Sequence, residues 1–426
     1  MRRKASAIRV DSPLEPPQPD DQTDTMHEAL LAHLHWTLTD GVGPVTFSRI
    51  VERFGDAATG FTASAAALAS IKGISTDRAG KIVAQRDDAR RAAEAEVAAA
   101  AEQGVRILCR EDVEYPHGLK QIDDAPIVMF VKGELRPTDH LALAIVGSRR
   151  CSIYGSEQAR RFGELLAGAG FTIVSGLARG IDAFAHHGAV DAGGRTLAVM
   201  GSGLNDIYPP ENRALAEKLL ASGAWISELP LRTVVRASNF PARNRIIAGL
   251  SLGVLVVEAA ARSGALITAR LASEYNREVF AIPGRVQDPM SIGTNKLIRD
   301  GGAKLVTCLE DILDELGEIG SKMRGATTSP PEPRASTRSL FDQQAIAPAG
   351  DDDARVSASN DPPASPSLSP IEQRAYSALA SGDAISQDAL IRLLAAPAGE
   401  ALAALTALEL KGLVRRLPGQ QICRRK

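Results

Sequence analysis

The chain has 426 residues, of which 44% are hydrophobic and 4% aromatic, enough to bury the cores of about two or three domains. Its 49 Lys and Arg against 51 Asp and Glu give a formal net charge of -2, which excludes a basic field over the whole molecule, so any polyanion site has to be a local patch. The four cysteines show no CxxC or Cys/His ligand spacing and no apolar run has membrane-spanning length, so we expect a cytoplasmic protein without structural metal, signal peptide or membrane partner.

Two segments precede the first predicted strand. Residues 1–25 are rich in Pro, Asp and Gln without periodicity, and we expect a disordered tail. Residues 26–103 have helical periodicity with breaks at 40–44 and 71–75, a pattern typical of a helix-hairpin-helix or SAM-like all-α module. In such hairpins, glycines let backbone amides approach a phosphate. A plain turn between helices fits the same residues, so DNA binding by this module stays open.

Residues 104–316 alternate strand-like and helix-like pieces. Two short strands, 105–109 and 127–131, are separated by prolines and are expected at the edge of the main sheet. The run Leu141–Val146 is apolar throughout, which favours burial on both faces of a parallel sheet. Repeated βα units predict an α/β domain with a doubly wound parallel sheet. The remaining strands are predicted at 171–175, 196–200, 225–227, 253–257, 279–282 and 304–306.

The C-terminal part divides into a linker and a small domain. Residues 317–369 are dominated by Ser, Pro, Asp and Ala, which predicts a disordered linker. Residues 370–426 predict helices at 370–380, 387–394 and 399–411, then strands at 413–417 and 421–423 joined by a Pro418-Gly419 turn. That order is typical of a winged helix. Winged helices contact either DNA or protein, and both uses stay open.

Small residues with arginine beside them follow several of the predicted strands. Carboxyl ends of parallel strands meet at one edge of a sheet, where loop amides and helix N-termini converge on anions. We therefore expect a basic pocket for several phosphates in succession. Phe240 either lies at this pocket and provides a face on which a base stacks, or is buried in the hydrophobic core. The expected nucleic-acid-binding residues are Gly147, Ser148, Arg149, Arg150, Ser175, Gly176, Arg179, Gly180, Phe240, Arg243, Asn244 and Arg245.

Five motifs occur in order along this domain: Gly-Ser-Arg at 147–149, Ser-Gly-Leu-Ala-x-Gly-Ile-Asp at 175–182, Phe-Pro-x-Arg-Asn-Arg-Ile-Ile at 240–247, Ala-Ile-Pro-Gly at 281–284 and Gly-Thr-Asn at 293–295. Together they resemble the DNA-processing protein A (DprA/Smf) family. The resemblance implies an extended Rossmann-like domain that binds single-stranded DNA, forms a homodimer and loads the RecA recombinase in natural transformation of competent cells. Because each replacement removes a charge-assisted contact to phosphate and neither residue lies in an apolar run, replacing Arg149 or Arg243 with alanine is expected to weaken DNA binding without unfolding the domain.

The resemblance also implies that the dimer and RecA surface lies near residues 291–305. The expected interface residues are Asn295, Leu297 and Ile298. A short final strand with an apolar helix beside it fits pairing across a two-fold axis, although Leu297 and Ile298 also fit inward packing against the sheet.

The alternative is a nucleotide-processing hydrolase of the related phosphoribohydrolase type. The chain lacks the Pro-Gly-Gly-x-Gly-Thr loop of those enzymes and the GxxxxGK[ST] loop of ATPases. Glu258 and Asp182 are the acidic residues expected near the pocket that an enzyme could use. We expect Asp182 to orient an arginine or to cap a helix. We expect His186 and His187 to pack in the interior or to face solvent, and not to be catalytic. We therefore predict a binding protein that is not an enzyme, without cofactor or catalytic residues.

Overall fold

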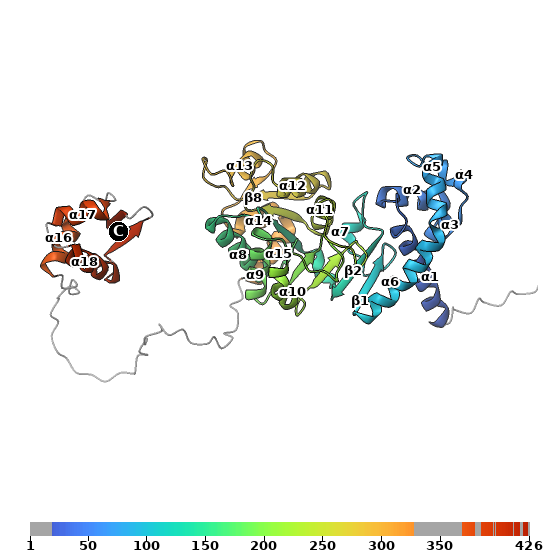
Figure 1. The fold of residues 1–426 in the computed structure, drawn as a ribbon, viewed down its shortest axis with the longest axis horizontal. Helices are drawn as coiled ribbons and strands as arrows, with labels where there is room; N and C mark the ends of the chain where they lie inside the picture. The colour runs from blue at the N-terminus through green and yellow to red at the C-terminus, as the bar shows by residue number, and fades with distance from the viewer. Residues whose placement is uncertain are drawn as a thin grey trace, which may run out of the picture. The chain divides into compact units, whose positions relative to one another are not determined.

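The computed structural model describes residues 19–327, 369–379, 385–394, 396, 398–411, 413–417 and 421–424. They belong to two compact units, Met1–Ala335 and Ser336–Lys426 (Figure 1). The predicted tail and linker fall mostly outside the described residues. Their predicted inner boundaries are wrong, because helix α1 (Pro19–Thr37) begins before residue 26 and helix α15 (Gly317–Thr327) occupies the predicted start of the linker.

Five further helices complete the N-terminal module, and short polar side chains determine where several of them begin. Asp56 and Ser64 cap α3 and α4, and Ser75 caps α5, each by accepting a hydrogen bond from a backbone N–H in the first turn. Arg78 donates to the carbonyls of Gly41 and Gly73, so both predicted breaks are loops that lie side by side. The five helices are α2 (Pro44–Phe54), α3 (Ala57–Thr62), α4 (Ala65–Ala69), α5 (Thr76–Ala84) and α6 (Arg86–Glu102).

One sheet of nine strands organises the rest of the first unit, counted over the described residues. Its order is β1-β2-β6-β5-β4-β3-β7-β8-β9, in which β2 is antiparallel to both of its neighbours, β1 and β6, and the remaining pairs are parallel. This confirms the predicted doubly wound sheet and the edge position of the first two strands. The strands are β1 (Val105–Cys109), β2 (Val128–Gly133), β3 (Ala142–Val146), β4 (Thr172–Ser175), β5 (Thr196–Val199), β6 (Ala224–Ser227), β7 (Gly253–Val256), β8 (Glu278–Ala281) and β9 (Lys304–Leu305).

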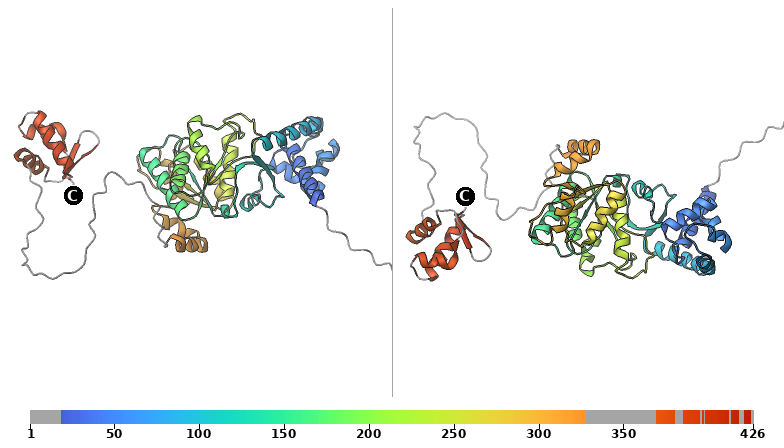
Figure 2. Two further views of the ribbon diagram at one scale, coloured as in Figure 1. Left: turned by 90° about the horizontal axis from the view of Figure 1, so that it is seen from below. Right: turned by 90° about the horizontal axis from the view of Figure 1, so that it is seen from above.

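Helices cover both faces of this sheet. Strand β3 is buried along its whole length, with Leu143 and Ile145 in one core cluster and Ala142, Ala144 and Val146 in the other. Helices α8 (Ile153–Gly168), α9 (Ile181–Asp191) and α14 (Leu309–Glu315) contribute to the first cluster, and α7 (His117–Lys120), α11 (Asn239–Leu250) and α12 (Gly264–Glu274) to the second. Helices α10 (Arg213–Leu219) and α13 (Ile292–Arg299) complete the unit, and Figure 2 shows α14 and α15 projecting on one side.

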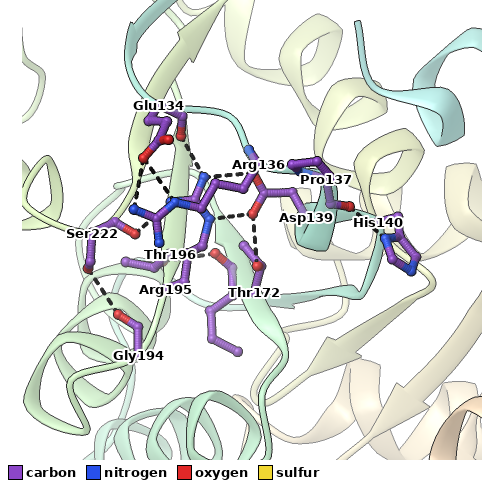
Figure 3. Close-up of polar contacts among 11 residues, drawn as sticks. Glu134, Arg136, Pro137, Asp139, His140, Thr172, Gly194, Arg195, Thr196 and Ser222 are labelled. Atoms are coloured by element: carbon purple, nitrogen blue, oxygen red, sulfur yellow. Dashed lines mark hydrogen bonds and ion pairs between the residues drawn. The ribbon is translucent and has the colours of Figure 1, made fainter. Parts of the chain in front are cut away.

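The segment between β2 and β3 is fastened by a nearly buried ion pair, Asp139–Arg195 (Figure 3). Asp139 lies in a short turn, Pro137–His140, and also accepts a hydrogen bond from the Thr172 hydroxyl at 2.9 Å. Arg195 donates to the Asp139 carboxylate at 2.7 Å and to the Ser222 carbonyl at 2.9 Å. This network holds the segment against the amino ends of β4 and β5.

The described part of the second unit is the predicted winged helix. Helices α16 (Pro370–Ala378), α17 (Gln387–Leu394) and α18 (Ala398–Leu410) surround a small core, and β11 (Val414–Leu417) pairs with β12 (Gln421–Arg424). A short strand that was not predicted, β10 (Ile385–Ser386), also pairs with β12. The predicted Pro418-Gly419 turn lies outside the described residues. In the described part of the chain, no helix combines the length and the apolar character needed to cross a membrane.

Candidate nucleic-acid interface

A pocket of about 690 Å³ opens at the carboxyl edge of the sheet. It lies where the strand order reverses between β3 and β7, the place at which open α/β sheets bind ligands. The loop after β3, the residues after β7 and the first turns of α11 and α12 line it. Of the predicted site residues, those that line the pocket are Gly147, Ser148, Arg149, Arg150, Phe240, Arg243 and Asn244.

The loop after β3 is held rigidly by its neighbours. The Ser148 N–H donates to the Glu258 carbonyl at 2.8 Å, and the Ile181 N–H donates to the Ser148 carbonyl at 3.2 Å. Gly180, which follows β4, has a φ of 74°, and a Cβ there would lie 2.3 Å from the Ser148 carbonyl oxygen. Only glycine allows this conformation and this close approach together. The loops after β3 and β4 therefore pack backbone to backbone and set the position of Arg149.

Glu258 is buried beneath this loop with 1% exposure. Its carboxylate accepts hydrogen bonds from the Ser152 backbone N–H at 2.9 Å and from the Ser152 hydroxyl. A Cβ at Gly155 would lie 2.3 Å from the same carboxylate, so the glycine makes room for it. Glu258 thus joins the end of β7 to the start of α8, and both of its oxygens accept hydrogen bonds from Ser152.

Arg149 and Phe240 form a stacked pair at the pocket. The guanidinium of Arg149 lies 4.5 Å from the centroid of the Phe240 ring, a cation–π arrangement. Arg149 and Arg150 are exposed, whereas Phe240 is half-buried and its ring centroid lies 6.0 Å from that of Tyr208. Phe240 is therefore a lining residue of the pocket, and one of its cation contacts is the exposed guanidinium of Arg149.

Arg243 differs from the expectation of a free phosphate ligand. It is 4% exposed and donates two hydrogen bonds to backbone carbonyls. One carbonyl belongs to Gly176, directly after β4, at 2.7 Å, and the other to Val199, the last residue of β5. Burial lowers the pKa of Arg243 to about 10, with nearby Asp182 acting in the opposite direction. Because Arg243 ties two strand ends together, we now expect its removal to destabilise the domain as well as the pocket.

Asp182 and Arg179 have separate partners. The Asp182 carboxylate accepts from the backbone N–H groups of Gly176 and Ala178 at 3.2 and 3.4 Å, which closes the loop after β4. Burial raises the pKa of this carboxyl, and Arg243 opposes the rise. Arg179 is exposed, forms an ion pair with Glu211 and lies 6.0 Å from the Tyr208 ring centroid, beside the pocket rather than among its lining residues.

Of three other predicted site residues, Ser175 and Arg245 have contacts away from the pocket, and Asn244 lies at it. Ser175 is fully buried and donates to the Ile145 carbonyl at 2.6 Å, so it belongs to the sheet. Arg245 points away from the pocket and forms an ion pair with Glu228, which corrects its inclusion in the site. Asn244 remains at the pocket, where its amide donates to the Gly264 carbonyl at 3.3 Å.

The predicted interface residues lie on α13. The Asn295 amide group makes two hydrogen bonds to the backbone of Gly284, both 3.1 Å long. Leu297 packs against the core cluster to which α12 contributes, so it follows the alternative of inward packing. Ile298 is half-buried. More exposed apolar side chains nearby are Ile292 on the same helix, at 46%, and Leu305 on edge strand β9, at 43%.

Several residues that line the pocket are not among the predicted site residues. Met290 comes from the loop after β8, and its sulfur lies 3.5 Å from the Ser148 hydroxyl. Ser263 and Gly264 lie at the start of α12 and line the pocket. A glycine in the loop after a predicted strand was the feature of the sequence that could have indicated them. Tyr208 was visible only as part of a Tyr-Pro turn. A loop methionine has no comparable sequence signal.

Comparison with known proteins gives consistent matches. Residues 106–317 match the family described as DNA recombination-mediator protein A, and residues 359–420 match the DprA winged helix domain. The chain is 35% identical over 412 residues to protein Smf of Synechocystis, covering 92% of this chain and 98% of that protein. It is 42% identical over 223 residues to the DNA processing protein DprA of Bacillus subtilis, covering 52% of this chain and 75% of that protein.

A solved structure agrees with these relatives. The X-ray structure of DNA processing protein A from Streptococcus pneumoniae matches with a TM-score of 0.59 and 35% identity, covering 67% of this chain and 97% of that one. Sequence similarity extends over nearly the whole chain, and the solved fold contains the same central domain. The chain therefore belongs to the DNA recombination-mediator protein A family, also called DprA or Smf.

Proposed function

We propose that the chain binds single-stranded DNA along the carboxyl edge of its sheet. The observation that carries this proposal is the exposed guanidinium of Arg149, stacked 4.5 Å over Phe240 at the pocket where the strand order reverses. A cation fixed on an aromatic ring offers both a charge for phosphate and a flat surface for a base.

The charges around the pocket favour an anionic ligand. The charged side chains that line it are Arg149, Arg150, Arg243 and Asp182. Asp182 already accepts two backbone hydrogen bonds and lies beside Arg243, so the exposed charge at the pocket comes from Arg149 and Arg150. Guanidinium groups bind phosphate oxygens through charge-assisted hydrogen bonds. The site therefore attracts the backbone of a nucleic acid although the whole chain carries a net charge of -2.

Single strands fit this arrangement better than duplex. Arg149 lies over the Phe240 ring, so an unstacked base packs on the outer side of the guanidinium and extends the stack. Bases in a duplex are stacked on one another and do not offer that face. The charged lining residues reach phosphates rather than forming an array that reads base edges, so we expect little sequence preference.

We further propose the homodimer, the loading of RecA and the role in natural transformation of competent cells that the family resemblance implies. Support for an interface comes from the edge position of β9 together with exposed Ile292 and Leu305. Apolar side chains beside an unpaired strand edge are suited to burial across a two-fold axis. The proposed role is binding and not catalysis, since the carboxylate of the pocket-lining Asp182 accepts from two backbone N–H groups and both oxygens of the buried Glu258 accept from Ser152.

Fluorescence anisotropy with labelled oligonucleotides of equal length, single-stranded and duplex, tests the proposal. We expect tighter binding of the single strand. For roughly four to six neutralised phosphates, the slope of log K against log salt should be about -3 to -4. Equal affinity for duplex, or an affinity that does not change with salt, would contradict the proposed interface.

A further inference from the structure

The structure brings together three side chains of the kinds that bind transition metals, far from the pocket. They are His33 on α1, Cys109 at the end of β1 and Glu111 in the loop that follows, and one ligand atom from each lies within 4.8 Å of the other two. No spacing pattern in the sequence indicated this cluster, because His33 and Cys109 belong to different parts of the fold. The cluster lies where the N-terminal helices meet the edge of the sheet.

The tautomer of His33 directs a lone pair into the cluster. Its Nδ1 lies 2.8 Å from the Ala29 carbonyl oxygen, so Nδ1 carries the hydrogen and donates it. In the neutral ring, Nε2 is then the unprotonated nitrogen. His33 is 4% exposed, and its buried Nε2 faces the Glu111 carboxylate. A backbone carbonyl that orients the ring in this way is the usual support of a metal-binding histidine.

The surroundings of Nε2 require a positive species between the groups. Nε2 lies 2.9 Å from the Glu111 Oε2 atom, and two lone-pair atoms at that distance need a proton or a metal ion between them. Cys109 is 3% exposed and adds a sulfur donor to the same space. In the metal-free protein, hydrogens on His33 Nε2 and on the Cys109 thiol both face the Glu111 carboxylate, and a metal ion would take the place of both.

The donor set selects the metal. Nitrogen, sulfur and one carboxylate oxygen match Zn²⁺, while Mg²⁺ and Ca²⁺ take oxygen ligands. Tetrahedral coordination needs donor separations of about 3.3–3.6 Å. The Glu111 side chain is 58% exposed and is able to adjust to that geometry, and its exposure also gives the ion a path from solvent.

We propose that His33, Cys109 and Glu111 bind one Zn²⁺ ion, with water in the fourth position, and that the ion clamps α1 to β1. Binding converts the Cys109 thiol to a thiolate and displaces the proton held between His33 Nε2 and Glu111, so two protons leave for each ion bound. The sequence expectation of no metal thus has a specific exception. Because α1 contacts both α6 and β1, the clamp would stabilise the junction between the helical module and the sheet.

Titration of the untagged, metal-free full-length protein with Co²⁺ tests the site. We expect one Co²⁺ per chain, a near-ultraviolet thiolate-to-cobalt band, and loss of that band when Zn²⁺ is added. Cys109→Ser should abolish the band, and Cys308→Ser, on another part of the sheet domain, should retain it. Failure of the wild-type protein to develop the band, or an unchanged band in Cys109→Ser, would overturn the proposal.

A second variant covers the case in which Cys109→Ser fails to fold. Glu111→Gln changes an exposed side chain, so we expect a folded protein whose Zn²⁺ affinity is lower by about tenfold or more. Zn²⁺ should also raise the melting temperature of the wild-type protein more than that of Glu111→Gln. Equal affinities and equal melting shifts in the two proteins would show that a proton alone joins His33 and Glu111.

Discussion

Replacing Arg149 with alanine separates binding from stability at the proposed interface. The side chain is exposed, and its resolved contact with another side chain is the stack on Phe240, so its removal should cost about 0.5–1 kcal/mol of folding free energy. A guanidinium–phosphate contact contributes about 1.5–3 kcal/mol, which corresponds to a loss of affinity for single-stranded DNA of about 10- to 150-fold. Losing one phosphate contact should also make the salt slope shallower by about 0.7.

Arg161→Ala is the matched control for this variant. Arg161 is also an exposed arginine over a phenylalanine, 5.8 Å from the Phe162 ring centroid, but it lies on α8 away from the pocket lining. Anisotropy titrations at several salt concentrations and thermal melts should be run on both variants and the wild-type protein. If Arg149→Ala binds as tightly as Arg161→Ala with the same salt slope, the placement of the phosphate contact at Arg149 is refuted.

Three further predictions follow from the same contacts. Arg243→Ala should lower the free energy of unfolding by about 2–4 kcal/mol, because it leaves the buried carbonyls of Gly176 and Val199 without their donor; urea denaturation that matches Arg149→Ala would contradict this. Burial lowers the pKa of His186 to about 3, so the unfolded chain takes up a proton below about pH 6.5 and the folded chain does not, and stability should fall by about 1.4 kcal/mol per pH unit below that point. Urea denaturation at pH 7 and pH 5 should show this loss in the wild-type protein and a smaller one in His186→Gln. If the proposed homodimer forms through α13 and β9, Ile292→Glu should give a folded monomer by sedimentation, whereas Val113→Glu, at a fully exposed loop position, should sediment as the wild-type protein does; a dimeric Ile292→Glu would place the interface elsewhere.

The sheet could be predicted because its strands carry a strong signal. Leu141–Val146 has no polar residue, and a strand buried on both faces by helices requires that pattern. The position of the pocket followed, since the loop after the first parallel strand lies at the reversal of strand order in any sheet of this kind. The start of α1 could not be predicted in the same way, because it lies in a polar segment without apolar periodicity. In α15, the four-residue spacing of Ile319 and Met323, which pack against a core cluster, was a signal that the composition-based prediction of a linker passed over.

The arginines of α11 show where sequence reasoning stopped short. Arg243 and Arg245 are two positions apart, and residues with that spacing on a helix point in directions about 200° apart. Both could not have lined one pocket, and the structure directs Arg243 toward Gly176 and Arg245 toward Glu228. The choice between them depends on how α11 packs on the sheet. That packing is a tertiary property with no local signal in the sequence around these residues.

The pairing of β2 with β6 has a consequence for how the chain assembles during synthesis. Strand β2 (Val128–Gly133) has β1 on one side, but its other partner, β6 (Ala224–Ser227), leaves the ribosome only after β3, β4 and β5. The helical module and the β1–β2 hairpin therefore emerge first with one strand edge unpaired. Such an edge pairs readily with other chains, so the nascent protein is most open to aggregation in this interval. A chain stalled before residue 224 should be held by chaperones, and one stalled well beyond residue 305, after the last strand of the sheet, should be released.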